Sequence, residues 1–246
     1  MYQTLIKPLA KDVYHFILDT LFPIYCLVCE KEDKGFICDE CINKLTKLQH
    51  QHCIICKKPS IGGLTHPACK TLHSPEGLIS IFDYHDKTVA DILIKGKYKF
   101  LPKIYEILAE LVVQNLLTDF PDILNFKSKI LNPLLVPLPL HKSRLRWRGF
   151  NQSRVLVQSI GNLLSLPYNI VLVRCKSTKT QKDLKREERI KNVSAAFKLN
   201  DNANIRDKNI ILIDDVVTTG STLLEACKVL KRNGAKDVWC LTVARD

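Results

Sequence analysis

The stretch of sequence that decides the fold runs Ile210-Ile211-Leu212-Ile213-Asp214-Asp215-Val216-Val217-Thr218-Thr219-Gly220-Ser221-Thr222. Four β-prone apolar residues followed by two carboxylates predict a buried parallel strand that leaves the sheet at the acidic pair, where open α/β sheets bind ligands. Apolar spacing predicts a helix from Ser221 to Arg232, so a phosphate would meet a helix N-terminus and neighbouring hydroxyls. Asp214 and Asp215 would then accept hydrogen bonds from the ribose of a sugar phosphate.

The string closely resembles the phosphoribosyl-diphosphate signature of type I phosphoribosyltransferases, which consists of an apolar strand, an acidic pair and a Thr-Thr-Gly-x-Thr loop. It contains neither Gly-x-Gly-x-x-Gly nor Gly-Lys-Ser/Thr, the other common phosphate motifs. The resemblance implies that Asp214 and Asp215 are catalytic residues, and that the phosphoribosyl group is bound by Thr218, Thr219, Gly220, Ser221 and Thr222. The alternative is an ordinary strand end with Ser221 as a helix cap.

Flanking segments predict the rest of the sheet and its helices. Strands are expected at residues 78–84 and 134–140, and Asn151 is expected to cap a helix that continues to Leu164. The buried stripe of that helix is expected to contain Val155, Leu156, Ile160, Leu163 and Leu164. Cys227 and Cys240 fall on an apolar helix face and in an apolar strand, so both are expected to be buried thiols.

The length and composition predict a globular protein. A chain of 246 residues, with 46% hydrophobic and 25% charged residues, suits one α/β domain and a small added module. Charged residues interrupt the apolar residues of the first 24 positions, so neither a membrane span nor a signal peptide is indicated. We therefore expect a cytoplasmic protein whose residues 1–24 form an amphipathic helix, docked on the protein or, alternatively, anchored at a membrane surface.

Paired cysteines predict metal sites between residues 26 and 69. Because no secretory signal is evident, pairs of cysteines indicate metal before disulfides, and four protein ligands per site indicate structural zinc, in one or two sites. The first set is Cys26, Cys29, Cys38 and Cys41, and the second is Cys53, Cys56, His66 and Cys69. Crossed pairing stays open, as does a fourth ligand from His50, His52 or His73. The alternative, a redox-active Cys-x-x-Cys, expects a single pair.

Positive charge is concentrated in the middle of the chain. The net charge is +12, and residues 141–191 contain thirteen Lys or Arg against three Asp or Glu. Cations near a strand end would bind a diphosphate or DNA phosphates, and the candidates are Arg144, Arg146, Arg148, Lys185 and Arg189. Trp147 and Phe150 lie among these arginines and could stack on bases of single-stranded DNA. Residues 175–192 are expected to form a mobile loop that closes over an anionic ligand. The alternative for both basic runs, residues 141–152 and 174–191, is a solvated surface.

Taken together, these segments resemble the ComF family, also called the competence protein F or GntX-like family. The resemblance covers nearly the whole chain, and its most characteristic part is Val136-Pro137-Leu138-Pro139-Leu140 with Arg144 and Arg148-Gly149-Phe150-Asn151-Gln152. Lys97-Tyr98 and the segment from Thr180-Gln181 to Ala196-Phe197 match further motifs. Two departures stand out: His66 replaces the more frequent cysteine, and residues 138–141 differ from the family's usual sequence.

The resemblance implies a role in natural transformation, in which such proteins help imported single-stranded DNA to reach the cytoplasm. The implied partners are single-stranded DNA, a competence DNA translocase helicase and a recombination mediator. The implied location is the cytoplasm, peripherally at the inner face of the cytoplasmic membrane.

We therefore expect an α/β fold, with a Rossmann-like parallel sheet of the type I phosphoribosyltransferase fold. The expected domains are an N-terminal helix at 1–24, a double zinc ribbon at 25–75 and a phosphoribosyltransferase-like domain at 76–246. The leading hypothesis is a DNA-uptake protein with a phosphoribosyl-diphosphate pocket. Its alternative is an active, Mg²⁺-dependent phosphoribosyltransferase of nucleotide metabolism with an unknown acceptor. A third interpretation is a structural zinc-ribbon adaptor, which leaves the acidic pair without a role.

Overall fold

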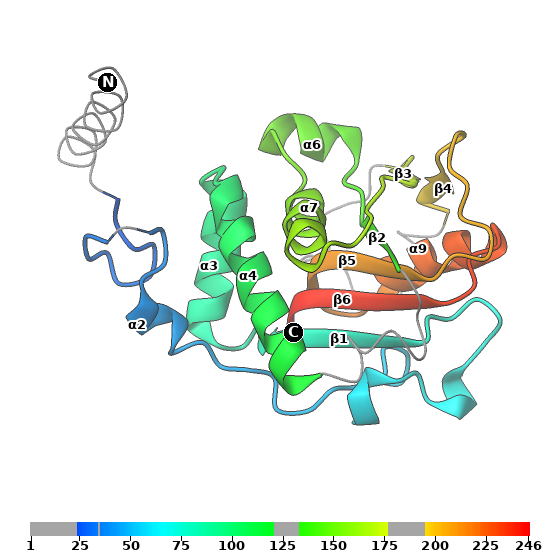
Figure 1. Cartoon of the computed structure of the whole chain (residues 1–246), viewed down its shortest axis with the longest axis horizontal. Coiled ribbons are helices and arrows are strands. Elements are labelled where there is room, and N and C mark those ends of the chain that lie inside the picture. The colour runs from blue at the N-terminus through cyan, green and yellow to red at the C-terminus, as the bar shows by residue number, and fades with distance from the viewer. Residues whose placement is uncertain (1–23, 34, 121–132, 177–194) are drawn as a thin grey trace, which may run out of the picture. The chain divides into compact units, whose positions relative to one another are not determined.

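A computed structural model describes residues 24–33, 35–120, 133–176 and 195–246 of the protein (Figure 1). The chain divides into two compact units, Met1–Leu45 and Thr46–Asp246. The helix expected at residues 1–24 lies outside the described residues, apart from Ile24. Within the described ranges, none of the helices combines the length and the apolar character needed to cross a bilayer.

The first unit is built around one pair of cysteine knuckles. An antiparallel bridge joins Tyr25 to Glu32, and the backbone N–H of Glu30 donates to the carbonyl of Cys26 over 2.9 Å. The short helix α2 (Asp39–Ile42) begins directly after Cys38. This arrangement places two Cys-x-x-Cys turns in one small unit.

The second unit contains a sheet of four parallel strands in the order β1-β6-β5-β2 (Figure 1). The strands are β1 (Gly77–Asp83), β2 (Leu134–Pro137), β5 (Ile210–Val217) and β6 (Val238–Arg245). A separate antiparallel pair consists of β3 (Leu172–Arg174) and β4 (Phe197–Leu199). The predicted α/β class with a parallel sheet is therefore confirmed.

Helices cover both faces of this sheet, as the alternation of side chains along β5 requires. Ile210 and Leu212 pack in one core with α9 (Ser221–Arg232), while Ile211 packs with residues of α4 (Pro102–Asp119) and α7 (Gln152–Leu164). The remaining helices are α3 (Lys87–Tyr98), α6 (Lys142–Arg148) and the 3₁₀ turns η1 (Ile61–Gly63) and η2 (Pro67–Cys69). Cys227 and Cys240 are buried as predicted, and their sulfur atoms lie 3.6 Å apart.

Three details of the predicted elements were wrong. The strand expected at 134–140 ends at Pro137. The strand expected to leave the sheet at Asp214 continues to Val217, because β6 runs beside it and pairs Val217 with Arg245. Leu163 is 51% exposed, since Val157 and Gly161 occupy the buried face of α7 instead.

The second pair of knuckles belongs to the same compact unit as the sheet. The side chain of Gln51 bonds both the N–H and the carbonyl of Ser80 in β1, at 3.0 and 2.8 Å. The N–H of Thr65 donates to the carbonyl of Glu76, and Ile54 is part of the core that contains α9. The division between compact units therefore falls between Leu45 and Thr46, whereas the sequence suggested a domain boundary between 75 and 76.

Candidate functional site

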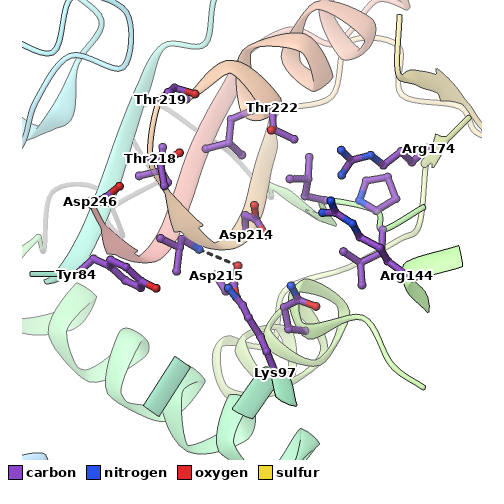
Figure 2. A pocket seen from close by; sticks show the side chains of 18 of the residues that line it. Tyr84, Lys97, Arg144, Arg174, Asp214, Asp215, Thr218, Thr219, Thr222 and Asp246 are labelled. Atoms are coloured by element: carbon purple, nitrogen blue, oxygen red, sulfur yellow. Dashed lines mark hydrogen bonds and ion pairs between the residues drawn. The ribbon is translucent and has the colours of Figure 1, made fainter. Parts of the chain in front are cut away.

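A cavity of about 320 Å³ opens beside the acidic pair, where β2 stops and β5 continues (Figure 2). Pro137 is the last residue of β2 to pair with β5, opposite Ile213, and none of the strands in the described part of the chain pairs with this edge of β5 beyond that point. The chain after β2 forms part of the cavity wall instead, through Leu138, Pro139 and Leu140. The cavity thus lies at the carboxyl end of the parallel sheet, as the sequence predicted.

Asp214 is a carboxylate with an altered proton affinity. Removal from bulk water, followed by the negative charge of Asp215, raises the pKa of Asp214 to about 7. The hydroxyl of Ser153, in the first turn of α7, donates to Asp214 Oδ1 over 2.8 Å and partly opposes this shift. Asp214 can therefore change protonation near neutral pH.

Asp215 is held by a lysine from a distant helix. Its side chain is 5% exposed, and Oδ2 lies 2.6 Å from Lys97 Nζ near the end of α3. A buried carboxylate is stable only when such a partner compensates its charge. Lys97 lines the same cavity, so it supplies positive charge at the floor of the site.

The loop of residues 218–222 connects β5 to α9 and forms one wall of the cavity. Gly220 has a positive φ of 78° and stands at the N-cap of α9, where it leaves no side chain in the capping position. The hydroxyls of Thr219 and Ser221 lie 2.9 Å apart. Thr218, Thr219, Gly220 and Thr222 line the cavity, whereas Ser221 does not. The open start of a 12-residue helix suits a phosphate group.

Arginines form the wall on the other side of Asp214 (Figure 2). Arg144 and Arg148 lie four positions apart on α6 and therefore share one helix face, which lines the cavity. Arg174, at the end of β3, joins them and is 7% exposed. Burial, and then the neighbouring cation, lowers the pKa of both Arg144 and Arg174. An anion bound among these guanidinium groups would relieve that repulsion.

Arg146 lies two positions from both Arg144 and Arg148 on α6, so it belongs to a different surface. It borders a shallow hollow together with Phe100, Pro102, Trp147, Arg148 and Phe150. Trp147 is 55% exposed and packs edge to face against both Tyr98 and Phe100, with ring centroids 5.7 and 5.6 Å away. We call Tyr98, Phe100, Arg146 and Trp147 the aromatic–arginine surface. It is contiguous with the cavity through Arg148, which borders both.

The two predicted zinc sites have the donor atoms that tetrahedral zinc needs. In each set the four donor atoms lie within 4.8 Å of one another, and the sets are Cys26, Cys29, Cys38, Cys41 and Cys53, Cys56, His66, Cys69. The sulfur atoms of Cys29 and Cys38 are 3.7 Å apart, close to the ~3.8 Å that tetrahedral Zn–S bonds require. His66 directs Nδ1 toward Cys56 at 3.2 Å, while Nε2 bonds the carbonyl of Pro59. Such an outer bond orients a zinc-binding imidazole.

Sequence reasoning placed some residues correctly at the cavity and missed others. Lys185 and Arg189 lie outside the described residues. Lys97, Arg174 and Ser153 were absent from the predicted site although the structure brings them to it. Lys97 stood in a segment that resembled a family motif, and Arg174 opened the second basic run. The motif around Lys97 and the basic run that begins at Arg174 were visible in the sequence. Neither feature indicated that the side chain of Lys97 or Arg174 lies near the acidic pair.

Comparison with known families agrees with this architecture. Residues 151–246 match the family described as phosphoribosyl transferase domain, and residues 17–70 match the double zinc ribbon domain. The fold, the cavity and these matches define the class: a double zinc ribbon joined to a domain of the type I phosphoribosyltransferase fold.

Among known relatives, the DNA utilization protein YhgH of Salmonella typhi is 31% identical over 216 residues, which cover 83% of this chain and 89% of that protein. The chain therefore belongs to the ComF family. Competence protein F of Haemophilus influenzae is 36% identical over 45% of this chain and 49% of that protein. Competence protein ComFC of Bacillus subtilis is 28% identical over 85% of this chain and 84% of that protein. In the Haemophilus match and others, the chain spans about half of the relative's length.

Solved structures with a related fold are more distant. The glutamine phosphoribosylpyrophosphate amidotransferase of B. subtilis is 14% identical, with a TM-score of 0.36, over 56% of this chain and 25% of that chain. The purine phosphoribosyltransferase of Pyrococcus horikoshii is also 14% identical, with a TM-score of 0.35, over 56% of this chain and 83% of that chain.

Proposed function

We propose that the protein supports DNA uptake in natural transformation, binding single-stranded DNA and a ligand of the phosphoribosyl-diphosphate type. One observation carries this proposal. The acidic pair, the loop 218–222 and three arginines surround a single cavity, and an exposed aromatic–arginine surface adjoins it through Arg148. Relatives named for competence and for DNA utilization support the DNA role.

The cavity suits a phosphoribosyl ligand by the chemistry of its walls. The loop 218–222 would hold the 5′-phosphate, and Asp214 and Asp215 would accept hydrogen bonds from the ribose hydroxyls. Arg144, Arg148 and Arg174 would neutralise a diphosphate. Two carboxylates and diphosphate oxygens are hard oxygen ligands, so they also suit Mg²⁺, which would neutralise further charge on the diphosphate.

The aromatic–arginine surface suits single-stranded DNA. Trp147, Tyr98 and Phe100 expose 55%, 52% and 48% of their surface, far more than large aromatic side chains in a core. Exposed rings stack on unpaired bases without sequence preference, and neighbouring arginines bind the phosphates. A DNA translocase helicase, a recombination mediator and a peripheral place at the cytoplasmic face of the membrane belong to the same proposal. They rest on the family resemblance.

Binding of a labelled oligodeoxythymidylate, followed by fluorescence anisotropy at several salt concentrations, tests the DNA role. We expect affinity to fall steeply with salt and Trp147→Ala to weaken binding by ~5- to 150-fold, because one stacked base contributes ~1–3 kcal/mol. Trp147→Phe should keep most of the affinity. Arg232→Ala, an exposed arginine on α9, serves as the control for charge. Salt-independent binding, or equal losses for Trp147→Ala and Arg232→Ala, would contradict the proposed surface.

A second candidate function is catalysis of phosphoribosyl transfer, which the intact acidic pair favours. In that reaction the bond between ribose C1 and the diphosphate oxygen breaks, and the electron pair leaves with the diphosphate. A lone pair of the acceptor nitrogen then forms the new bond to C1, and the proton that this nitrogen carried is released to the solvent. Arg144, Arg148 and Arg174 would stabilise the departing charge. Diphosphate release from phosphoribosyl diphosphate, measured with single nucleobases as acceptors, tests this function. The double variant Asp214→Asn, Asp215→Asn should abolish any release observed.

A further inference from the structure

We infer that the knuckle of residues 53–57, which belongs to the second predicted zinc site, positions the phosphate loop 218–222, so that zinc at this knuckle and a phosphate ligand at the loop stabilise each other. This inference rests on the proposed function for the ligand, but not for the contact between knuckle and loop. It concerns Ile54 and Lys57, which lie on the knuckle and are not zinc ligands.

Ile54 fills the space directly behind Gly220. It lies between the ligands Cys53 and Cys56 and is 2% exposed. A Cβ added to Gly220 would lie 3.0 Å from Ile54 Cγ1 and 3.3 Å from the carbonyl oxygen of Ile54. The backbone of the loop therefore packs tightly on the knuckle, and a methyl group at Gly220 would require Ile54 to shift by a few tenths of an ångström. The same core holds Val217 and Leu223, which flank the loop.

Lys57 reaches the loop from the other end of the knuckle. Its N–H closes the knuckle by donating to the carbonyl of Cys53 over 2.9 Å, and its φ is 62°. From this position Nζ lies 3.5 Å from the carbonyl oxygen of Thr218, to which it donates. A third link is Arg245, whose Nη1 donates to the carbonyl of His52 over 3.1 Å while its backbone pairs with Val217.

The contacts between the knuckle and the loop should depend on bound zinc, because zinc holds the knuckle in shape. A Cys-x-x-Cys turn keeps its shape when both sulfur atoms bind one metal ion, and small metal-bound modules lose their structure without it. Because the loop packs on the knuckle, removing zinc from this site should release Thr218, Thr219 and Gly220. Linkage is reciprocal, so a phosphate ligand that orders the loop should also slow the loss of this zinc.

The equivalent knuckle of the first predicted zinc site, residues 26–30, provides a matched control. Leu27 occupies the position after Cys26 that Ile54 occupies after Cys53, and Glu30 corresponds to Lys57, with a φ of 60°. That knuckle lies in the other compact unit. Leu27→Ala and Ile54→Ala therefore make the same kind of truncation in equivalent turns, and both leave all zinc ligands in place.

Hydrogen–deuterium exchange of the full-length, zinc-loaded protein tests the contact without any ligand. We expect Ile54→Ala to speed exchange of the amides of residues 218–222 by at least about tenfold, because a buried side chain behind the loop is lost. Leu27→Ala should leave this exchange unchanged. Should Ile54→Ala fail to fold, Ile54→Val and Lys57→Met provide milder changes with the same expected direction. Unchanged loop exchange in a folded Ile54 variant that keeps its zinc would overturn the inference.

Ligand binding separates this inference from the proposed function. Ribose 5-phosphate, titrated calorimetrically, should bind Ile54→Ala at least about tenfold more weakly than the wild type and Leu27→Ala. Ribose 5-phosphate should also slow transfer of one zinc, but not the other, to a chelating dye. A wild type that binds no ribose 5-phosphate would contradict the proposed pocket, while faster loop exchange in Ile54→Ala would still support the contact. Equal affinities of the wild type and of Ile54→Ala for ribose 5-phosphate would overturn the inference but not the proposed pocket.

Discussion

At the scale of single residues, the acidic pair combines two different electrostatic situations. Asp215 is compensated by Lys97 at 2.6 Å, whereas Asp214 receives a hydroxyl hydrogen bond from Ser153 and faces the charge of Asp215. The pKa of Asp214 is consequently raised to about 7, through removal from water and then through Asp215. Asp214 therefore carries its proton for part of the time near neutral pH.

The raised pKa of Asp214 predicts a pH dependence of stability. Between the pKa of the unfolded state, ~4, and about 7, the folded protein binds one proton more, so the free energy of unfolding falls as pH rises. Asp214→Asn removes this titration and keeps an acceptor for Ser153. We expect the free energy of unfolding of the variant, minus that of the wild type, to increase from pH 6 toward pH 7, by at most ~1.4 kcal/mol per pH unit.

Urea unfolding of both proteins at pH 6, 7 and 8 measures that difference, and other titrating groups cancel in the comparison. A difference that is independent of pH would show that Asp214 has an ordinary pKa. The same charge change should affect the ligand, because ribose hydroxyls and Mg²⁺ bind the carboxylate form. Affinity for phosphoribosyl diphosphate with Mg²⁺ should therefore rise between pH 6 and pH 8.

The ion pair of Lys97 and Asp215 predicts strong coupling between the two side chains. Lys97→Met leaves a buried carboxylate without compensation, so the free energy of unfolding should fall by ~3–5 kcal/mol. Adding Asp215→Asn should recover much of that loss, since no uncompensated charge remains. Urea unfolding of both single variants and the double variant gives the coupling energy, and additive effects would show that the pair is energetically unimportant.

At the scale of elements, helix α6 directs three arginines to two different surfaces, although the sequence suggested that Arg144, Arg146 and Arg148 act as one group. Sequence reasoning placed residues 144–148 after a strand end but did not assign a helix there. His141 caps α6 by accepting from the N–H of Ser143, and Gly149, with φ of 75°, ends it. Residues four apart on a helix share a face, and residues two apart do not. Arg144 and Arg148 therefore line the cavity, while Arg146 joins the aromatic rings.

This sorting predicts that two alanine variants of α6 lose different ligands. Arg144→Ala should weaken binding of phosphoribosyl diphosphate with Mg²⁺ by at least ~10-fold, because a charge-assisted hydrogen bond contributes ~1.5–3 kcal/mol. Arg146→Ala should leave that affinity unchanged and reduce both the affinity for single-stranded DNA and its salt dependence. Calorimetry and anisotropy on both variants measure the two affinities. Equal effects of the variants on both ligands would contradict separate sites.

Helix and strand boundaries were predictable where the signal is local. The cap at Asn151 and the helix of residues 221–232 agree with expectation, because each depends on neighbouring residues in the chain. The extent of β5 was not predictable, since its last residues are held by pairing with β6. The exposure of Leu163 depends likewise on α4, which packs against α7 from elsewhere in the chain.

At the scale of the whole molecule, two similar cysteine sets belong to different compact units. The second set is integrated with the sheet through Gln51, Ile54 and Thr65, whereas the first lies in the unit that ends at Leu45. The double zinc ribbon, continuous in sequence, is therefore divided between the two compact units. Each zinc is expected to stabilise the unit that contains it.

Tryptophan fluorescence can separate these two contributions, because Trp147 and Trp239 are the protein's two tryptophans and both lie in the second unit. Cys56→Ser should lower the urea midpoint followed by tryptophan fluorescence. Cys29→Ser should leave that midpoint unchanged, although it should also release about one zinc ion per chain. A similar loss of midpoint in both variants would show that the units unfold together.

The sequence alone determined the α/β class, the acidic pair with the loop 218–222, and the two sets of candidate zinc ligands, because each depends on contiguous or closely spaced residues. Only the tertiary structure decided that Lys97 pairs with Asp215, that Arg146 lies outside the cavity lining, and that the knuckle of residues 53–57 packs against the loop 218–222. Lys57 and Thr218 are separated by 161 positions. Contacts over such separations form only when the sheet assembles, so short-range patterns of residue type cannot specify them.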